Sequence, residues 1–211
     1  MNSHSPFFTV RGVVFSALFG ALMVVMSFMQ FHPGFSPVQF TLENMAVMLA
    51  GVFLGAKYGF FSIFSVVFLT ALGLPLLHGE GGLTLLLKPT GGFIWMFPIC
   101  AFLAGWVAQR IKGYGWKSAA LMFLGVFLLG DLPVYITGIP WLAYKINGTI
   151  AEALALGCYP YLIPDAMKAA AATAIIMAVR RAFPALSLTG SDAASVVRLD
   201  DGAAGSEAKQ R

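Results

Sequence analysis

The chain has 211 residues, of which 59% are hydrophobic, 14% aromatic and only 10% charged. Its mean hydropathy of +0.83 excludes a water-soluble domain of this size, which cannot hide so much apolar surface in one core, so we expect an all-α membrane protein. The net charge of +4 comes from basic residues at the ends of apolar runs and does not indicate nucleic-acid binding. The two cysteines are too few for a disulfide framework or a metal site. The sequence has no Gly-Lys-Ser or Gly-Lys-Thr phosphate-binding loop.

Six apolar runs are candidates for membrane-spanning helices, which need about 20 residues each. The first run follows Arg11 and has no small-x-small cleavage site, so we expect a retained helix rather than a signal peptide. The second and third runs are short and are separated by a turn with Lys57 at its tip. In chain order, the expected spans are 12–31, 41–56, 58–74, 91–109, 117–139 and 160–182.

Two long connections and a polar tail complete the expected organisation. A glycine-rich loop covers residues 78–92, and a second long loop covers 140–159. We expect residues 1–183 to form a single six-helix membrane domain. Residues 184–211 are polar and alanine-rich, which predicts a disordered cytoplasmic tail.

Lysine and arginine are distributed unequally between the two sides of this arrangement. Basic residues near the ends of spans favour the cytoplasmic side. If the N-terminus is cytoplasmic, Lys88 and Lys145 lie outside, and with six spans the C-terminus is cytoplasmic too. The basic residues then on the cytoplasmic side are Arg11, Lys57, Arg110, Lys112, Lys117, Arg180 and Arg181. We therefore expect a multi-pass protein of the cell membrane whose long loops open outward.

Four ionisable residues lie within or at the edge of the apolar runs: Glu43, Asp131, Asp165 and Lys168. Each costs roughly 2.5–3.5 kcal/mol at a helix centre, so such residues usually serve a function. Asp165 and Lys168 are three residues apart and share a helix face, where they either bind a ligand or form an ion pair that only fixes packing. For Glu43, at a helix N-terminus, a structural role is as plausible as a functional one. Asp131 is either a packing hydrogen-bond acceptor or a group facing an internal cavity.

Small residues form two further patterns. Ala17 and Ala21 flank Gly20 on the first helix and make a narrow stripe that suits close contact with another helix of this chain or of a partner. A glycine cluster in the 78–92 loop consists either of turn residues or of positions where the backbone approaches a small ligand. The cluster comprises Gly79, Gly81, Gly82, Gly91 and Gly92.

Four segments in this order resemble the BioY family, the biotin-specific S components of energy-coupling factor transporters. They are FSPVQFTLENMAVMLAGVFLGAKYGFFS, GLPLLHGEGGLTLLLKPTGGF, GIPWLA and PYLIPDAMKA. The resemblance extends over nearly the whole apolar region. It implies a six-helix subunit that binds biotin near the outer surface and docks with a transmembrane coupling (T) component and a pair of cytoplasmic ATPases. The chain itself would need no cofactor, because ATP would be used only by the partner subunits.

The resemblance also implies roles for particular residues. Asp165 and Lys168 match the family's Asp-x-x-Lys motif and would contact the ligand, and Ala17 and Ala21 match the element that meets the coupling component. The remaining implied ligand-site residues are Glu80, Gly81, Lys88, Gly91, Gly92 and Phe93. The sequence departs from the family where Phe93 replaces a tyrosine, Glu43 a glutamine and Lys88 a small residue.

The chemistry of biotin suits these residue types. An aspartate accepts hydrogen bonds from its ureido N–H groups, and a lysine meets its carbonyl or its carboxylate. We expect Phe93, Trp95 and Tyr161 to wall the ring. Two alternatives stay open: an ion-coupled secondary transporter that uses Asp131 and Glu43 as a proton relay, and an intramembrane aspartyl protease built on Asp131 and Asp165.

Overall fold

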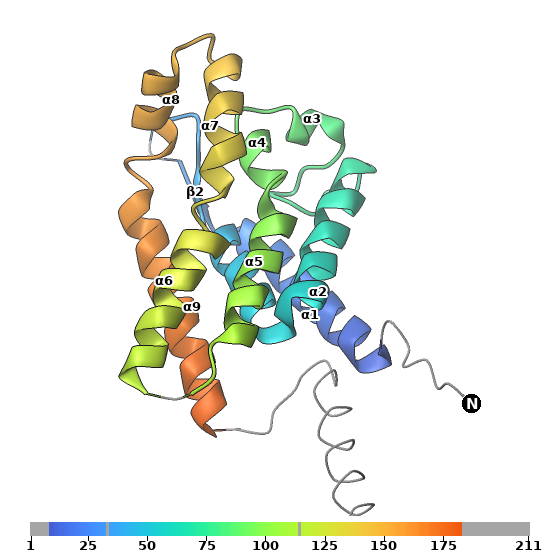
Figure 1. Ribbon diagram of the computed structural model, residues 1–211. Helices are drawn as coiled ribbons and strands as arrows, with labels where there is room; N and C mark the ends of the chain where they lie inside the picture. The colour runs from blue at the N-terminus through green and yellow to red at the C-terminus, as the bar shows by residue number, and fades with distance from the viewer. Residues whose placement is uncertain (1–8, 33, 114, 183–211) are drawn as a thin grey trace, which may run out of the picture.

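The computed structural model describes residues 9–32, 34–113 and 115–182, and these residues form a bundle of long helices (Figure 1). Five helical segments are long and apolar enough to cross a membrane, which confirms the all-α membrane class. They are Val10–Ser27, Glu43–Ala71, Gly91–Arg110, Trp116–Lys145 and Leu162–Ala182. The expected tail, 184–211, lies outside the described residues.

The first span is helix α1 (Val10–Ser27), which ends earlier than expected. The chain after Ser27 becomes extended, and β1 (Gln30–Phe31) pairs antiparallel with β2 (Phe40–Thr41). The end of the apolar run therefore contributes to a short hairpin beside the bundle instead of a last helical turn.

Helix α2 (Glu43–Ala71) contains the second and third expected spans. Gly55 inside it has φ of 78° and ψ of 175°, far from helical values. A Cβ atom on Gly59 would lie 2.9 Å from Cα of Gly51, whereas residues eight apart in a straight helix are about 12 Å apart. The chain therefore folds back at Gly55, near the turn expected around Lys57, and the two halves of α2 pack against each other.

A similar interruption divides the expected span 117–139. Helix α6 (Trp116–Gly130) ends before Asp131, and α7 (Val134–Lys145) begins after Pro133. Pro133 has no N–H to bond the preceding turn, so the regular helix stops there. The expected span 117–139 therefore contains a break, although Trp116–Lys145 as a whole is long and apolar enough to cross a membrane.

The segment 140–159 is also not the long loop that we expected. It holds the end of α7 and a further helix, α8 (Ile150–Gly157), whose first turn is closed by a capping box between Thr149 and Glu152. In the glycine-rich loop, α3 (Leu83–Leu86) forms one turn. Helices α4 (Gly91–Ile94) and α5 (Phe97–Arg110) together form the fourth span, and α9 (Leu162–Ala182) forms the last.

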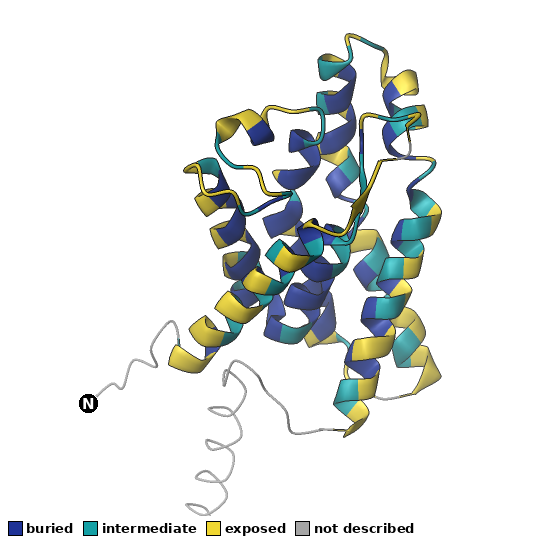
Figure 2. Cartoon of the chain, turned by 180° about the vertical axis from the view of Figure 1, so that it is seen from behind, coloured by how far each residue is buried: buried dark blue, intermediate teal, exposed yellow. Residues whose placement is uncertain are grey.

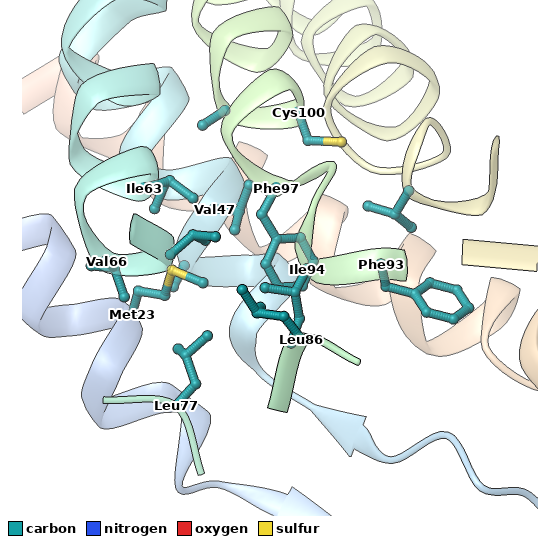
Figure 3. Packing of buried hydrophobic residues seen from close by; sticks show 14 of the residues in the cluster. Met23, Val47, Ile63, Val66, Leu77, Leu86, Phe93, Ile94, Phe97 and Cys100 are labelled. Carbon is teal, nitrogen blue, oxygen red and sulfur yellow. The ribbon is translucent and has the colours of Figure 1, made fainter. Parts of the chain in front are cut away.

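Apolar side chains are divided between the interior of the bundle and its outer surface. Met23, Ile63, Leu86 and Cys100 belong to a buried cluster that joins α1, α2, the glycine-rich loop and α5 (Figure 3). Exposed residues colour the outward faces of the helices in Figure 2, and many of these are large apolar side chains such as Phe68. Apolar side chains on the outward faces of the helices are what contact with lipid requires.

The two ends of the bundle differ. Helices α3 and α8 lie at one end, whereas the connection between α5 and α6 and the C-terminal end of α9 lie at the other (Figure 1). Most of the basic residues counted from the sequence belong to this second end. They include Arg110, Lys112, Lys117, Arg180 and Arg181.

Close backbone contact between α2 and α5 generates a stability prediction. A Cβ atom on Gly105 would lie 2.4 Å from backbone atoms of both Gly55 and Ala56, which cannot move aside as a flexible side chain can. We expect Gly105→Ala to lower the free energy of unfolding by about 1–3 kcal/mol, although alanine normally favours a helix. Unfolding in detergent measures the effect.

The matched control is Gly20→Ala, another helical position, where the nearest atom to the new Cβ would be a methyl carbon of Val66 at 3.1 Å and the nearest backbone atom would be 3.6 Å away. This variant should lose much less stability. Equal stability of the two variants would contradict the packing described at Gly55.

Candidate ligand-binding site

A cavity lies among α4, α7, the first turns of α9 and the segment that leads into α2. Its volume is about 50 Å³, smaller than the roughly 300–1,000 Å³ that is common for small-molecule sites, so a ligand requires its walls to move apart. Polar residues from several elements line it together with aromatic and aliphatic side chains. The lining residues include Gln39, Glu43, Asn44, His78, Phe93, Tyr135, Tyr161, Asp165 and Lys168.

Asp165 and Lys168 meet in this cavity. Lys168 Nζ lies 2.9 Å from Asp165 Oδ1, and the two side chains are only 11% and 3% exposed. The hydroxyl of Tyr135 donates to Asp165 Oδ2 over 2.6 Å. Because these contacts neutralise and hold the carboxylate, a charge can persist at this depth. The pair forms one wall of an open space and is not embedded in solid protein.

Aromatic residues form the apolar walls. Tyr161 stacks on Phe40 with ring centroids 4.2 Å apart, and its hydroxyl donates to the carbonyl of Val38. Phe93 meets the edge of Tyr135 at 6.0 Å, and in Figure 3 its ring points away from the other labelled core residues. The site thus offers ring faces beside a few fixed polar groups, as pockets for small organic ligands do.

A second polar pair lies elsewhere on the cavity wall. His78 Nε2 is 3.1 Å from Glu43 Oε1, and both side chains are nearly inaccessible to solvent. The two atoms are close but their geometry is not that of a hydrogen bond. The side-chain oxygen Oε1 of Gln39, which also lines the cavity, is buried without a hydrogen-bond partner among the described residues. Burial lowers the pKa of His78, but the side-chain contact with Glu43 and its charge outweigh burial and raise that pKa above its ordinary value.

A third polar contact links the cavity to the interior. Asn44 lines the cavity and donates from Nδ2 to Asp131 Oδ1 over 3.0 Å. Asp131 itself is 1% exposed and does not belong to the lining. The second carboxyl oxygen of Asp131 has no hydrogen-bond partner among the described residues.

Some of the residues expected at the ligand site lie beside the cavity and not in its wall. Lys88 Nζ pairs with Glu80 Oε2 at 2.5 Å on the surface, where the two side chains are 48% and 46% exposed. Trp95 is 50% exposed and does not line the cavity, so the expectation that it walls a ring was wrong. Roles for Glu80 and Lys88 in ligand binding stay predictions.

Tight packing explains three of the five loop glycines, Gly81, Gly91 and Gly92, whereas Gly79 and Gly82 have positive φ angles of 75° and 84°. A Cβ atom on Gly81 would lie 2.4 Å from the carbonyl oxygen of Leu74, and one on Gly91 would overlap the carbonyl of Leu86. Gly92 has the same relation to Trp141. These contacts fix the path of the loop and set Phe93 in the cavity wall, and contact between the glycines and a ligand stays a prediction.

Ala17 and Ala21 line a separate apolar groove on the outside of the bundle, formed by α1 and the second half of α2. Gly20 and Ser62 lie in the same groove, together with larger side chains such as Tyr58, Phe61 and Leu69. The stripe expected from the sequence is therefore accessible to a partner helix.

Sequence reasoning did not identify four of the polar lining residues: Gln39, Asn44, His78 and Tyr135. Tyr135 lies four residues after Asp131, a spacing that was a usable signal for an inward-facing polar group. His78 stands within the glycine-rich loop, but nothing in its sequence surroundings indicates Glu43 as its partner. Among the described residues, no group of three histidine, cysteine, aspartate or glutamate side chains is arranged to hold a metal ion.

Comparisons with known proteins agree with one another. The model described as the BioY family matches residues 1–185. The biotin transporter BioY of Rhizobium etli is 33% identical over 185 residues, which cover 84% of this chain and 97% of that protein. The probable biotin transporter BioY of Pyrococcus horikoshii is 39% identical over 165 residues, which cover 78% and 91%.

A solved structure is similar as well. The crystal structure at 2.1 Å of the S-component for biotin from an ECF-type ABC transporter matches with a TM-score of 0.75 and 29% identity, over 82% of this chain and 92% of that one.

The contact between His78 and Glu43 predicts a dependence of stability on pH. Since the pKa of His78 is raised in the folded protein, the protonated imidazole stabilises the fold. This contribution is complete below pH 6.5, the ordinary pKa of histidine, and is lost as the pH rises through the raised value. Thermal unfolding in detergent should give a higher melting temperature at mildly acidic than at alkaline pH.

His78→Gln and Glu43→Gln should each flatten this dependence, because each removes one partner. The same pH dependence in wild type and in both variants would show that other groups cause it.

Proposed function

Because this chain belongs to the BioY family, we propose that the cavity beside Asp165 and Lys168 is where it binds biotin. The protein is a multi-pass protein of the cell membrane and takes up biotin as an S component. The observation that carries the site assignment is that the buried pair, held at 2.9 Å, lines an open-mouthed cavity together with aromatic side chains.

The polar and apolar parts of biotin correspond to the parts of this cavity. Its ureido ring has two N–H donors and a carbonyl acceptor, which suit the carboxylate of Asp165 and the ammonium of Lys168. Its fused apolar rings suit the walls formed by Phe93 and Tyr161. Its carboxylate, at the end of a flexible chain, extends toward the mouth, where Lys88 supplies a cation if the surface pair with Glu80 opens.

The proposed topology has six membrane crossings with both termini in the cytoplasm. Support for six crossings comes from the fold-back at Gly55, which divides α2 into two antiparallel halves. If each half counts as one crossing, the five long segments give six crossings, although each half is shorter than the usual span of about 20 residues. Support for the orientation comes from the basic residues at the end of the bundle opposite α3 and α8. The ligand then enters from outside.

The proposed partners are a transmembrane coupling component and a cytoplasmic ATPase pair, in addition to membrane lipid. The groove that holds Ala17 and Ala21 is accessible and apolar, and its small side chains allow a helix to approach closely. ATP would be used only by those partner subunits, and we expect the chain to need no cofactor and no nucleic acid.

The two alternatives are not favoured. A proton relay through Asp131 and Glu43 has little support, because Asp131 contacts Asn44 whereas Glu43 contacts His78. The protein is not an enzyme: its relatives are named as transporters. In addition, the two oxygens of Asp165 accept hydrogen bonds from Lys168 and Tyr135.

The biotin assignment predicts the effect of Asp165→Asn. Loss of a hydrogen bond to a charged group costs about 1.5 kcal/mol or more, so affinity for biotin should fall at least about tenfold. Calorimetry of the purified protein measures it. Glu80→Gln, a matched change at the exposed pair, should have a smaller effect, and unchanged affinity in Asp165→Asn would remove this residue from the site.

If partners dock in the groove, a large side chain placed there should weaken partner binding and leave ligand binding unchanged. Ala17→Trp should reduce recovery of the coupling component and ATPases with the tagged protein about tenfold or more, because overpacking costs about 1–3 kcal/mol. Biotin affinity should stay unchanged.

The control is Leu18→Trp, which alters the neighbouring residue of α1. Leu18 is 57% exposed and does not line the groove. If both variants recover the partners as well as wild type does, docking takes place on another surface.

A further inference from the structure

Asp131 is a buried acid that the proposed biotin contacts do not use. It lies just beyond the end of α6 and is 1% exposed. Its Oδ1 accepts a hydrogen bond from Nδ2 of Asn44 over 3.0 Å, whereas its Oδ2 has no hydrogen-bond partner in the described part of the chain. The hydrogen bond with Asn44, which lines the cavity, therefore links the side chain of Asp131 to the cavity wall.

The chemistry of the two side chains determines how Asn44 is oriented. An asparagine amide has an NH2 donor on one side and a carbonyl acceptor on the other. The carboxyl oxygen of Asp131 is an acceptor, so the amide must turn its NH2 group toward Asp131. The carbonyl oxygen Oδ1 of Asn44 is then directed away from Asp131, and Asn44 lines the cavity.

We propose that Asp131 is a positioning residue, which fixes the amide of Asn44 so that its carbonyl oxygen faces the ligand and selects an N–H donor there. This inference rests on the proposed function, in which that donor is a ureido N–H of biotin. Asp131 does not touch the ligand.

The polar inventory of the cavity explains why a second acceptor is needed. The two oxygens of Asp165 already accept from Lys168 and Tyr135, although each keeps a further lone pair. A ureido ring has two N–H donors on opposite sides of its carbonyl group, and one carboxylate is poorly placed to meet both. Asp165 and Asn44 together supply an acceptor for each donor, and Lys168 meets the carbonyl.

The test is a double-mutant cycle of Asp131→Leu and Asn44→Ala, with biotin affinity measured by calorimetry. Leucine has a shape similar to aspartate but accepts no hydrogen bond. A buried N–H without a partner is costly, so the amide of Asn44 turns its NH2 group into the cavity. We expect Asp131→Leu to lower affinity about tenfold in the wild-type background and to have no further effect in the Asn44→Ala background.

The conservative variant Asp131→Asn should bind biotin within about threefold of wild type, because its carbonyl oxygen still accepts from Asn44. A purely structural role for Asp131 would instead reduce affinity equally in both backgrounds. That result, or wild-type affinity in Asp131→Leu, would overturn the inference alone. A wild-type protein without affinity for biotin would overturn the proposed function and this inference with it.

Discussion

The buried pair of Asp165 and Lys168 is the interaction on which the site depends. A single charge at this depth is expensive in a membrane protein, and the pair persists because each charge compensates the other and Tyr135 donates to the remaining carboxyl oxygen. Placing these groups on α7 and α9 commits the two helices to a fixed separation. A cavity lined by polar groups and aromatic rings follows from that arrangement.

The frame around the site is held by small residues. Close approach of the two halves of α2 to each other and to α5 depends on Gly51, Gly59 and Gly105, whose missing Cβ atoms leave room for neighbouring backbone. Lipid does not drive helices together as water does, so tight packing of this kind is a main source of cohesion within a bilayer. Small residues on α1 likewise leave the groove beside Ala17 accessible on the outer surface.

The sequence was sufficient for features that depend on composition and local spacing. It predicted the apolar spans, the turn near Gly55, and the meeting of Asp165 with Lys168, which are three residues apart on one helix. It could not predict contacts between distant segments, such as Glu43 with His78, because nothing local specifies them. The break at Pro133 was visible in the sequence but was outweighed by the continuous apolar run, and α8 was read as a loop although Thr149 and Glu152 form a capping box.

Three polar contacts surround one cavity, and only the pair of Asp165 and Lys168 was expected from the motif. Native mass spectrometry of the wild-type protein, purified in mild detergent from cells supplied with biotin, tests the central claim most directly. The account predicts one retained biotin per chain in the wild type and none when Asp165 and Lys168 are both replaced by alanine. Absence of biotin from the wild type, or equal retention by the double variant, would contradict it.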